Sequence, residues 1–448
     1  MRTLLLFFIV GISLHAAPNI LLIVADDQRP DTIHALGNAV IDTPNLDRLV
    51  ARGTSFSRAY AGYPICHVSR AQILTGNPAF KALPKYPGGA IDPRLATLGG
   101  TLQKAGYHTC YTGKWHNDGH PTQRGYSTTN GLYSSGGGKG VTQPDMDDRG
   151  RPLTGYRGWT FKDENNQAEL GKGVGLQSDN SRHIADGAIH GIQTAPKDKP
   201  LFLHVNFAFP HDPRQWPAGM KGRYAAAKMP LPANFAPKHP FDHGNIDGRD
   251  ELLLKTPRIE SEVREELAIY HAMITDLDAL PAPDETIIIF TSDQGLALGS
   301  HGLLGKQNEY EHSIRSPLII CGPGLPKNER SAALVNLNDL FPTLCDLVGT
   351  AVPGTVQSKS LAPLLRHQAE RAHDFVTGVF TDTQRMICDE RWKFVIYPKV
   401  GREQLFDLKS DPDEMHDLSG DPVHRAKKEG LAAKLQTWRQ QNGDPNLE

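Results

Sequence analysis

Cysteine is scarce in this sequence, and neither charge is in clear excess. Five cysteines among 448 residues are far too few for a disulfide-rich scaffold, and no two of them form a CxxC pair. Lysine and arginine total 48 against 50 for aspartate and glutamate, which gives a formal net charge of -2. A chain without a global basic field is not expected to bind nucleic acid. The sequence also lacks internal repeats and low-complexity tracts.

Apolar runs long enough to cross a membrane are absent as well. The apolar run at residues 4–12 is shorter than the ~20 residues that a membrane span needs. It follows Arg2 and precedes the small residues Ala16 and Ala17, which is the pattern of a secretory signal peptide. We therefore expect residues 1–17 to be a signal peptide and the mature protein to be exported to the periplasm or the extracellular space.

The remaining composition is that of a globular protein. Hydrophobic residues make up 39% and charged residues 22%, which argues against disorder and against a coiled coil. The length predicts two or three domains, or one large α/β domain with an appendage. The high content of glycine and proline, 43 and 33 residues, predicts many turns and long loops.

Apolar strands alternate with helical patterns along most of the chain. Strands are expected at residues 19–25, 107–111, 200–209, 286–290 and 316–321, and helices at 44–51, 69–75, 95–105, 258–280 and 336–348. The alternation predicts an α/β fold, with a large, mainly parallel sheet sandwiched by helices. Residues 117–181 are rich in Gly, Ser, Asn and Asp, so we expect long surface loops there with little regular structure.

The pattern changes after about residue 370. Short strands are expected at residues 375–380, 385–388, 392–397 and 404–408, followed by a helix at 423–441. They predict a small antiparallel sheet with one helix. The expected organisation is therefore a main α/β domain at 18–370 and a small C-terminal α+β subdomain at 371–448.

Oxygen-bearing side chains follow two of the buried strands. Asp26 and Asp27 come directly after the first strand, and Asp293 and Gln294 follow the strand at 286–290. Ligands gather beyond the carboxyl ends of the strands in a sheet of this kind. Three carboxylates and an amide oxygen would suit a hard cation such as Ca²⁺. Helix capping or turn formation is the alternative for each single acid.

Cys66 stands at the start of an expected helix. Helix amides and the helix dipole favour an anion at that position, and Arg70 lies four residues on, on the same helix face. This arrangement favours a reactive group, whereas a lone cysteine is otherwise a small buried hydrophobe. The other four cysteines could pair in an exported protein or remain buried free thiols, and the sequence leaves both open.

Several short motifs, and the order in which they occur, resemble those of the type I sulfatases of the alkaline phosphatase-like superfamily. The resemblance covers almost the whole mature chain. The matching segments, in the family's order, are residues 18–31 (PNILLIVADDQRPD), 66–70 (CHVSR) with 74–76 (LTG), 113–116 (GKWH), 210–211 (PH), 292–295 (SDQG) with 299–302 (GSHG) and 305–306 (GK), 310–317 (YEHSIRSP), and 404–408 (QLFDL) with 411–412 (DP).

The resemblance implies that Cys66 is oxidised after translation to Cα-formylglycine by a maturation enzyme. It further implies one Ca²⁺ per chain, held by Asp26, Asp27, Asp293, Gln294 and the modified Cys66. A hydroxyl of the hydrated aldehyde would be activated by Asp293 and the metal and would attack the sulfur of a sulfate ester.

The same resemblance implies roles for five basic residues. Arg70, Lys114 and Lys306 would hold the sulfate oxygens and the developing charge. His211, with Lys306, would protonate the leaving oxygen, and His116 would take a proton during release of sulfate. Taken alone, Lys306 could be a solvated surface lysine and His211 a turn residue. The expected substrate is a sulfated carbohydrate.

Three features depart from the family pattern. Val68 stands where the family usually has Pro or Ala two residues after the cysteine, so we expect the maturation enzyme to recognise Cys66 more weakly. Gln294 stands where the family often has Asn or His, and its carbonyl can still bind Ca²⁺. The segment between Asp278 and Thr286 is shorter than usual.

Two other functions are compatible with the sequence. The first is a phosphomonoester or phosphonate monoester hydrolase of the same superfamily, with the same metal and nucleophile. The second is a binding protein for sulfated glycans whose Cys66 stays unmodified because of Val68.

Overall fold

The computed structural model describes residues 17–85, 88–138, 140, 145–147, 149–151, 153–278 and 285–446. Residues 1–16 of the expected signal peptide and residues 279–284 of the shortened segment lie outside the described residues. Among the described helices, none combines the length and the apolar character that crossing a membrane requires.

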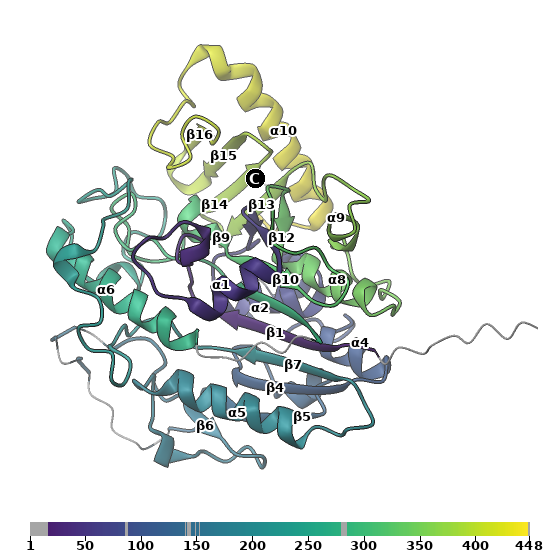
Figure 1. Ribbon diagram of the computed structural model, residues 1–448. Helices are drawn as coiled ribbons and strands as arrows, with labels where there is room; N and C mark the ends of the chain where they lie inside the picture. The colour runs from purple at the N-terminus through teal and green to yellow at the C-terminus, as the bar shows by residue number, and fades with distance from the viewer. Residues whose placement is uncertain are drawn as a thin grey trace, which may run out of the picture.

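A nine-stranded sheet forms the centre of the described chain, in the order β11-β2-β10-β8-β1-β7-β4-β5-β6 (Figure 1). In that order the strands are Glu329–Ser331, Gly53–Phe56, Leu318–Cys321, Thr286–Ser292, Asn19–Ala25, Leu201–Asn206, His108–Lys114, Thr128–Ser134 and Thr160–Lys162. The five strands from β8 to β5 run parallel, whereas β10 and β6 lie antiparallel on either side of them. The predicted α/β class with a mainly parallel sheet is confirmed.

Helices cover both faces of this sheet because its central strands are apolar on both sides. In β1, Ile20, Leu22 and Val24 pack into one core with helices α2, α4 and α8. Leu21 and Ile23 pack into the opposite core with α1, α5 and α6. The helices in chain order are α1 Pro44–Arg52, α2 Cys66–Thr75, α3 Ala79–Ala82, α4 Leu98–Lys104, α5 Asn180–Thr194, α6 Glu260–Leu277, α7 Glu311–Ile314, α8 Leu340–Leu347, α9 Ala362–Leu365 and α10 Arg425–Asn442.

The C-terminal part forms the small antiparallel sheet that the sequence predicts, drawn in yellow-green at the top of Figure 1. Its strands are β13 Val376–Phe380, β14 Gln384–Cys388, β15 Trp392–Tyr397 and β16 Arg402–Asp407. One face packs on α10 through Leu431 and Leu435. The other face packs against Tyr60, Ile314 and Leu334 of the main body. A three-stranded sheet of β12 Val335–Asn336, β3 Ala59–Tyr60 and β9 Arg315–Ser316 lies at this junction.

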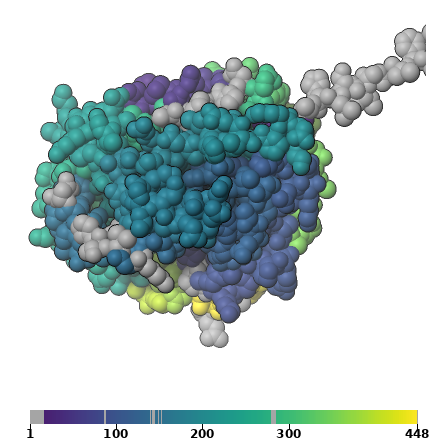
Figure 2. Space-filling view, turned by 90° about the horizontal axis from the view of Figure 1, so that it is seen from below, coloured from purple at the N-terminus to yellow at the C-terminus, as the bar shows by residue number. Residues whose placement is uncertain are grey.

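The prediction of irregular loops over residues 117–181 is wrong in part. Strands β5 and β6 lie within this segment, and α5 follows directly. Helix α5 approaches the sheet through small residues, since a Cβ on Gly187 would meet the Asn130 carbonyl oxygen at 2.9 Å. A contact made by glycine leaves no run of large apolar residues for a sequence pattern to detect. Figure 2 shows this middle part of the chain, coloured blue to teal, as most of the face seen from below.

All five cysteines lie within the described residues, and each is buried and unpaired. Cys321 lies in β10 and Cys345 in α8, as the sequence predicts. Of the two alternatives that the sequence leaves open, the structure therefore shows buried free thiols.

A buried ion pair holds the end of α10 against the small sheet, and its loss should destabilise the fold. The Arg385 guanidinium, 1% exposed, lies 2.7 and 2.9 Å from the two carboxylate oxygens of Asp444. Asp444→Ala removes the carboxylate that neutralises this buried cation, so we expect a loss of about 3–5 kcal/mol in the free energy of unfolding. Urea denaturation followed by circular dichroism measures the loss.

Asp374→Ala is the matched control for this prediction. Asp374 forms an exposed ion pair with Arg371, with side chains 74% and 61% exposed. Such a pair contributes less than about 1 kcal/mol. Equal urea midpoints for the two variants would contradict the importance given to the buried pair.

Candidate active site

The pairing of β1 with β8 brings the predicted acids together. The two strands run parallel with Ala25 opposite Ser292, so Asp26 and Asp293 leave the sheet side by side. The Asp27 amide donates a hydrogen bond to the Asp293 carboxylate at 3.1 Å. Asp27 adopts a φ of 68°, a left-handed conformation that Asp tolerates better than most residues. The predicted convergence of these acids at the carboxyl edge of the sheet is therefore present.

Cys66 is the first residue of α2 and points into this group of acids. Its Sγ lies 3.1 Å from Asp26 Oδ1, 3.8 Å from Asp27 Oδ1 and 3.3 Å from Lys306 Nζ. Only 1% of the residue is exposed. The helix is fixed to the sheet at this end, because the Ser69 hydroxyl donates to the backbone carbonyl of Asp293 at 2.6 Å.

Three buried cations neutralise the three acids, one for each. Arg70 Nε lies 2.9 Å from Asp293 Oδ2, and Lys114 Nζ lies 2.5 Å from Asp26 Oδ2. Lys306 Nζ lies 2.8 and 3.0 Å from the two carboxylate oxygens of Asp27. The side chains of these cations are 4% exposed or less. The structure thus excludes the solvated-surface interpretation of Lys306.

Burial and pairing set the protonation of this group. Burial acts to raise the pKa of Asp26, but Lys114, then His211 and Arg70, hold that pKa well below its usual range. Burial raises the pKa of Asp27 to about 7, against the attraction of Lys306. Burial would lower the pKa of Lys306, yet the Asp27 carboxylate raises it well above its usual value. Burial also raises the pKa of Asp293. Asp26 is therefore the acid of the three whose ionised form is most favoured.

The two histidines have different neighbours. His211 Nε2 lies 3.8 Å from Asp27 Oδ2, while its Nδ1 lies 2.6 Å from the Asp212 carbonyl oxygen. The ring of His116 lies 5.7 Å from that of His67 and 5.2 Å from that of Trp159. His116 Nδ1 is buried and has no hydrogen-bond partner among the described residues. Burial lowers the pKa of both histidines well below the usual value, which favours their neutral forms.

The acids and Cys66 are suitably arranged to hold a metal ion. Asp26, Asp27, Cys66 and Asp293 each offer a ligand atom, all within 4.8 Å of one another. Gln294 Oε1 is buried without a hydrogen-bond partner among the described residues, while its Nε2 donates to Asp27 at 2.5 Å. An unpartnered buried oxygen is costly, and a cation would satisfy it. A set of carboxylate and amide oxygens fits Ca²⁺.

Sequence reasoning missed three residues that complete this centre. The Tyr156 hydroxyl donates to Asp26, and its ring lies 4.8 Å from that of His211. Asn206 accepts a hydrogen bond from Arg70 at the end of β7. Asp212 Oδ1 lies 3.1 Å from His211 Nδ1. The predicted strand at 200–209 ran past Asn206, which is the last residue of the observed β7, so its position at a strand end was hidden. Tyr156 comes from a loop with no sequence signal.

The comparisons with known proteins agree with this geometry. The model of the sulfatase family matches residues 18–350, and a model of the C-terminal part of N-sulphoglucosamine sulphohydrolase matches residues 299–441. An arylsulfatase of Clostridium perfringens is 28% identical over 442 residues, which cover 90% of each chain. PehA of Trinickia caryophylli, described as a multifunctional alkaline phosphatase superfamily protein, is 28% identical over 513 residues and 96% of each chain.

Solved structures share the fold. A protein solved with its substrate D-glucosamine-2-N,6-O-disulfate superposes with a TM-score of 0.77 at 22% identity, covering 96% of this chain and 98% of the other. The family model spans most of the chain, and its range includes each of the acids, cations and histidines described above. The chain therefore belongs to the sulfatase family, in the alkaline phosphatase-like superfamily, and is a sulfuric ester hydrolase.

Proposed function

We propose that this protein releases sulfate from a sulfated carbohydrate, with formylglycine formed from Cys66 as the nucleophile. The observation that carries the proposal is the position of Cys66 Sγ, 3.1 Å from Asp26 and 3.3 Å from Lys306 in a buried centre. A cysteine that only filled the core would be surrounded by apolar side chains, not by three acids and three cations.

Two groups would complete the centre. A Ca²⁺ held by Asp26, Asp27, Asp293, Gln294 and the modified Cys66 would supply positive charge for the sulfate and the nucleophile. Formylglycine would supply, once hydrated, a hydroxyl nucleophile that a thiol lacks.

The chain's own cations would bind the sulfate group. Arg70, Lys114 and Lys306 are buried around Cys66, where their charges are little screened by water. Preorganised cations of this kind stabilise charge that develops on the oxygens of a transferring group. Asp293, held by Arg70, would accept the proton of the attacking hydroxyl.

The two histidines would transfer protons in two different steps, departure of the alcohol and release of sulfate. His211 Nε2 faces the centre, and a sulfate anion beside it would favour its protonated form, which can donate to the leaving oxygen. His116 Nδ1, buried and unpartnered among the described residues, would accept a proton during release of sulfate. Its neutral form, favoured by burial, is the form that can accept.

A carbohydrate substrate is supported by two comparisons. The C-terminal family model is that of N-sulphoglucosamine sulphohydrolase, and a protein of the same fold was solved with a sulfated glucosamine as its substrate. We further propose export by the N-terminal segment 1–17, a catalytic domain at 18–370, a subdomain at 371–448, and a formylglycine-generating enzyme as maturation partner.

A phosphonate or phosphate monoester hydrolase is the second candidate, favoured by the similarity to the multifunctional PehA. Initial rates on 4-nitrophenyl sulfate, 4-nitrophenyl phosphate and a 4-nitrophenyl phosphonate monoester separate the two. We expect kcat/KM to be greatest for the sulfate, because the sulfatase family model and the arylsulfatase of Clostridium perfringens match most of the chain. A greater value for either phosphorus ester would replace the proposed function with the second candidate.

Loss of Asp293 should remove both the metal and turnover. Asp293 lies at the end of β8, and its two carboxylate oxygens contact the Asp27 amide and Arg70. Asp293→Ala takes away a metal ligand and the proton acceptor, so we expect calcium content to fall from about one per chain to near zero, with kcat/KM reduced by more than about 100-fold. Plasma emission spectrometry and a sulfate-release assay measure the two effects.

Asp278→Asn is the control for this variant. Asp278 is also buried, but its carboxylate accepts hydrogen bonds from the Asn45 and Leu46 amides at the start of α1. We expect this variant to keep its calcium. Full turnover by Asp293→Ala in the presence of a chelator would refute the metal site.

Maturation should improve when Val68 is replaced by proline. Val68 is the third residue of α2, within the first turn, where backbone amides have no helical partner and proline is tolerated. Proline fixes φ in the unfolded segment that a maturation enzyme would bind, whereas the β-branched Val favours extended backbone without fixing it. Mass spectrometry of the peptide containing Cys66 measures the modified fraction, which should rise in Val68→Pro together with activity.

Cys66→Ala is the control for maturation and should show no sulfate release. If chains that carry only unmodified Cys66 hydrolyse sulfate esters at the full rate, the formylglycine mechanism is wrong for this protein. If no host modifies Cys66 and no activity is seen, the sulfated-glycan binding protein becomes the better proposal.

A further inference from the structure

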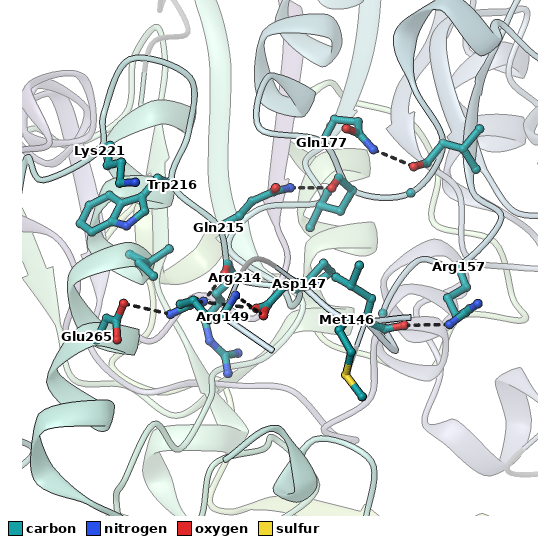
Figure 3. Close-up of a pocket in the computed structure, with 17 residues that line it drawn as sticks. Met146, Asp147, Arg149, Arg157, Gln177, Arg214, Gln215, Trp216, Lys221 and Glu265 are labelled. Carbon is teal, nitrogen blue, oxygen red and sulfur yellow. Dashed lines mark hydrogen bonds and ion pairs between the residues drawn. The ribbon is translucent and has the colours of Figure 1, made fainter. Parts of the chain in front are cut away.

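A cavity of about 520 Å³ lies between α6 and the loops that carry Arg149 and Trp216 (Figure 3). Its wall includes Gly155 and Pro213. Gly155 precedes Tyr156, whose hydroxyl contacts Asp26, and Pro213 follows the segment that carries His211. Gly155 also packs closely on Asp212, because a Cβ on this glycine would meet Asp212 Oδ2 at 2.6 Å, and Asp212 Oδ1 lies 3.1 Å from His211 Nδ1. The wall of the cavity is therefore one residue removed from His211. Its volume is in the range of pockets that hold small ligands.

Ion pairs keep the floor of this cavity in place. Glu266 of α6 is 1% exposed, and its carboxylate binds Arg149 at 2.9 Å and also contacts Arg214. The Arg214 carbonyl oxygen in turn accepts a hydrogen bond from Arg149 at 2.7 Å. Arg151 joins this group and also pairs with Asp147, and Arg149 lies within 3.7 Å of Asp147 and Glu265. Three carboxylates thus balance three guanidinium groups, so the group does not call for an anionic ligand, and it fixes the segment that follows His211.

The upper part of the cavity carries groups that suit a sugar. Trp216 offers an aromatic face, and Figure 3 shows it beside Lys221 at one end. Gln177 and Gln215 use their Nε2 atoms for backbone carbonyls, at 2.6 and 2.5 Å, and their Oε1 atoms have no partner among the described residues. Each Oε1 can therefore accept a hydrogen bond from a sugar hydroxyl.

Lys221 supplies the unbalanced charge of the cavity. It is exposed and makes no ion pair or hydrogen bond with any residue that the structure describes. A lysine left unpaired next to an aromatic ring at a cavity mouth can pair with an anion on a ligand whose body stacks on that ring.

We propose that this cavity is a second sugar subsite, which binds an anionic unit of the glycan next to the sulfated sugar. Trp216 stacks on the ring of that unit, Gln177 and Gln215 accept its hydroxyls, and Lys221 pairs with its carboxylate or second sulfate. This inference rests on the proposed function, since it names the chain that carries the sulfate ester. It makes the substrate an oligosaccharide and not a free monosaccharide.

Binding of defined oligosaccharides to a variant that cannot hydrolyse them tests the subsite. Three tetrasaccharides of alternating uronic-acid and N-acetylglucosamine units serve as probes: the acidic form, the carboxyl-reduced form, and the carboxyl-reduced form with one 6-sulfate on each N-acetylglucosamine. Isothermal titration calorimetry measures the Kd of each for the full chain in a Cys66→Ala background, which prevents hydrolysis.

We expect the parent protein to bind an anionic probe about tenfold more tightly than the neutral one, in line with a charge-assisted contact. Preference for the acidic probe identifies a uronate carboxylate, and a preference for the sulfated probe that depends on Lys221 identifies a second sulfate in the cavity. Lys221→Ala should abolish the preference. Trp216→Ala should raise the Kd of all three probes about tenfold, and Trp216→Phe should raise it less, since a smaller ring still stacks.

Lys434→Ala, an exposed lysine on α10, is the matched control and should leave all Kd values unchanged. Equal affinity of the parent protein for the charged and neutral probes, or wild-type affinity in Trp216→Ala, would overturn the subsite. Failure of the two proposals can be told apart, because hydrolysis of 4-nitrophenyl sulfate by the wild type is measured separately. Hydrolysis without probe binding would contradict only the subsite. Probe binding without hydrolysis would contradict only the proposed reaction.

Discussion

The burial of three carboxylates at the carboxyl ends of β1 and β8 is the constraint on which the rest of the site depends. Two parallel strands in register place Asp26 and Asp293 side by side, and the left-handed turn at Asp27 adds the third. Charges this deep are tolerated only when they are paired. The pairing cations come from three distant parts of the chain: α2, β4 and the loop after β8. The acids therefore hold together the segments that surround Cys66.

The same pairing prepares the centre for an anion. Balancing the acids does not by itself require the cations to lie on any one side of them. Lys306 and Arg70 nevertheless lie on the side where α2 begins, together with Cys66. A metal ion bound to the carboxylates would neutralise part of their negative charge. The positive charge of Lys306 and Arg70 would then be free to attract an anionic group of the substrate beside Cys66. The electrostatics of the resting centre and its proposed chemistry thus follow from one set of contacts.

The sequence predicted those parts that depend on strong local patterns. The strands predicted at 19–25 and 286–290 are apolar runs that leave few alternatives, and the acids lie just beyond them; the structure extends the second strand to Ser292. The helix predicted at 69–75 begins three residues earlier, at Cys66. The sequence did not predict contacts that depend on the shape of a residue far away in the chain. Helix α5 packs through Gly187, which carries no apolar signal, and Tyr156 reaches Asp26 from 130 positions away. Residues of this kind are identified by tertiary contacts and by nothing in their own neighbourhood.

One short segment of the chain connects the buried centre around Cys66 with the cavity proposed to bind a second sugar. It starts at the end of β7 with Asn206, which holds Arg70, passes His211 and Arg214, and ends with Trp216 and Lys221 at the cavity. Glu266 holds Arg214 between His211 and Trp216, so one buried ion pair fixes both the cavity wall and the segment that carries His211. A ligand in the proposed subsite would therefore bind a wall that is held in place together with His211. In such an arrangement, binding energy from a distant part of the substrate can be used at the reacting group.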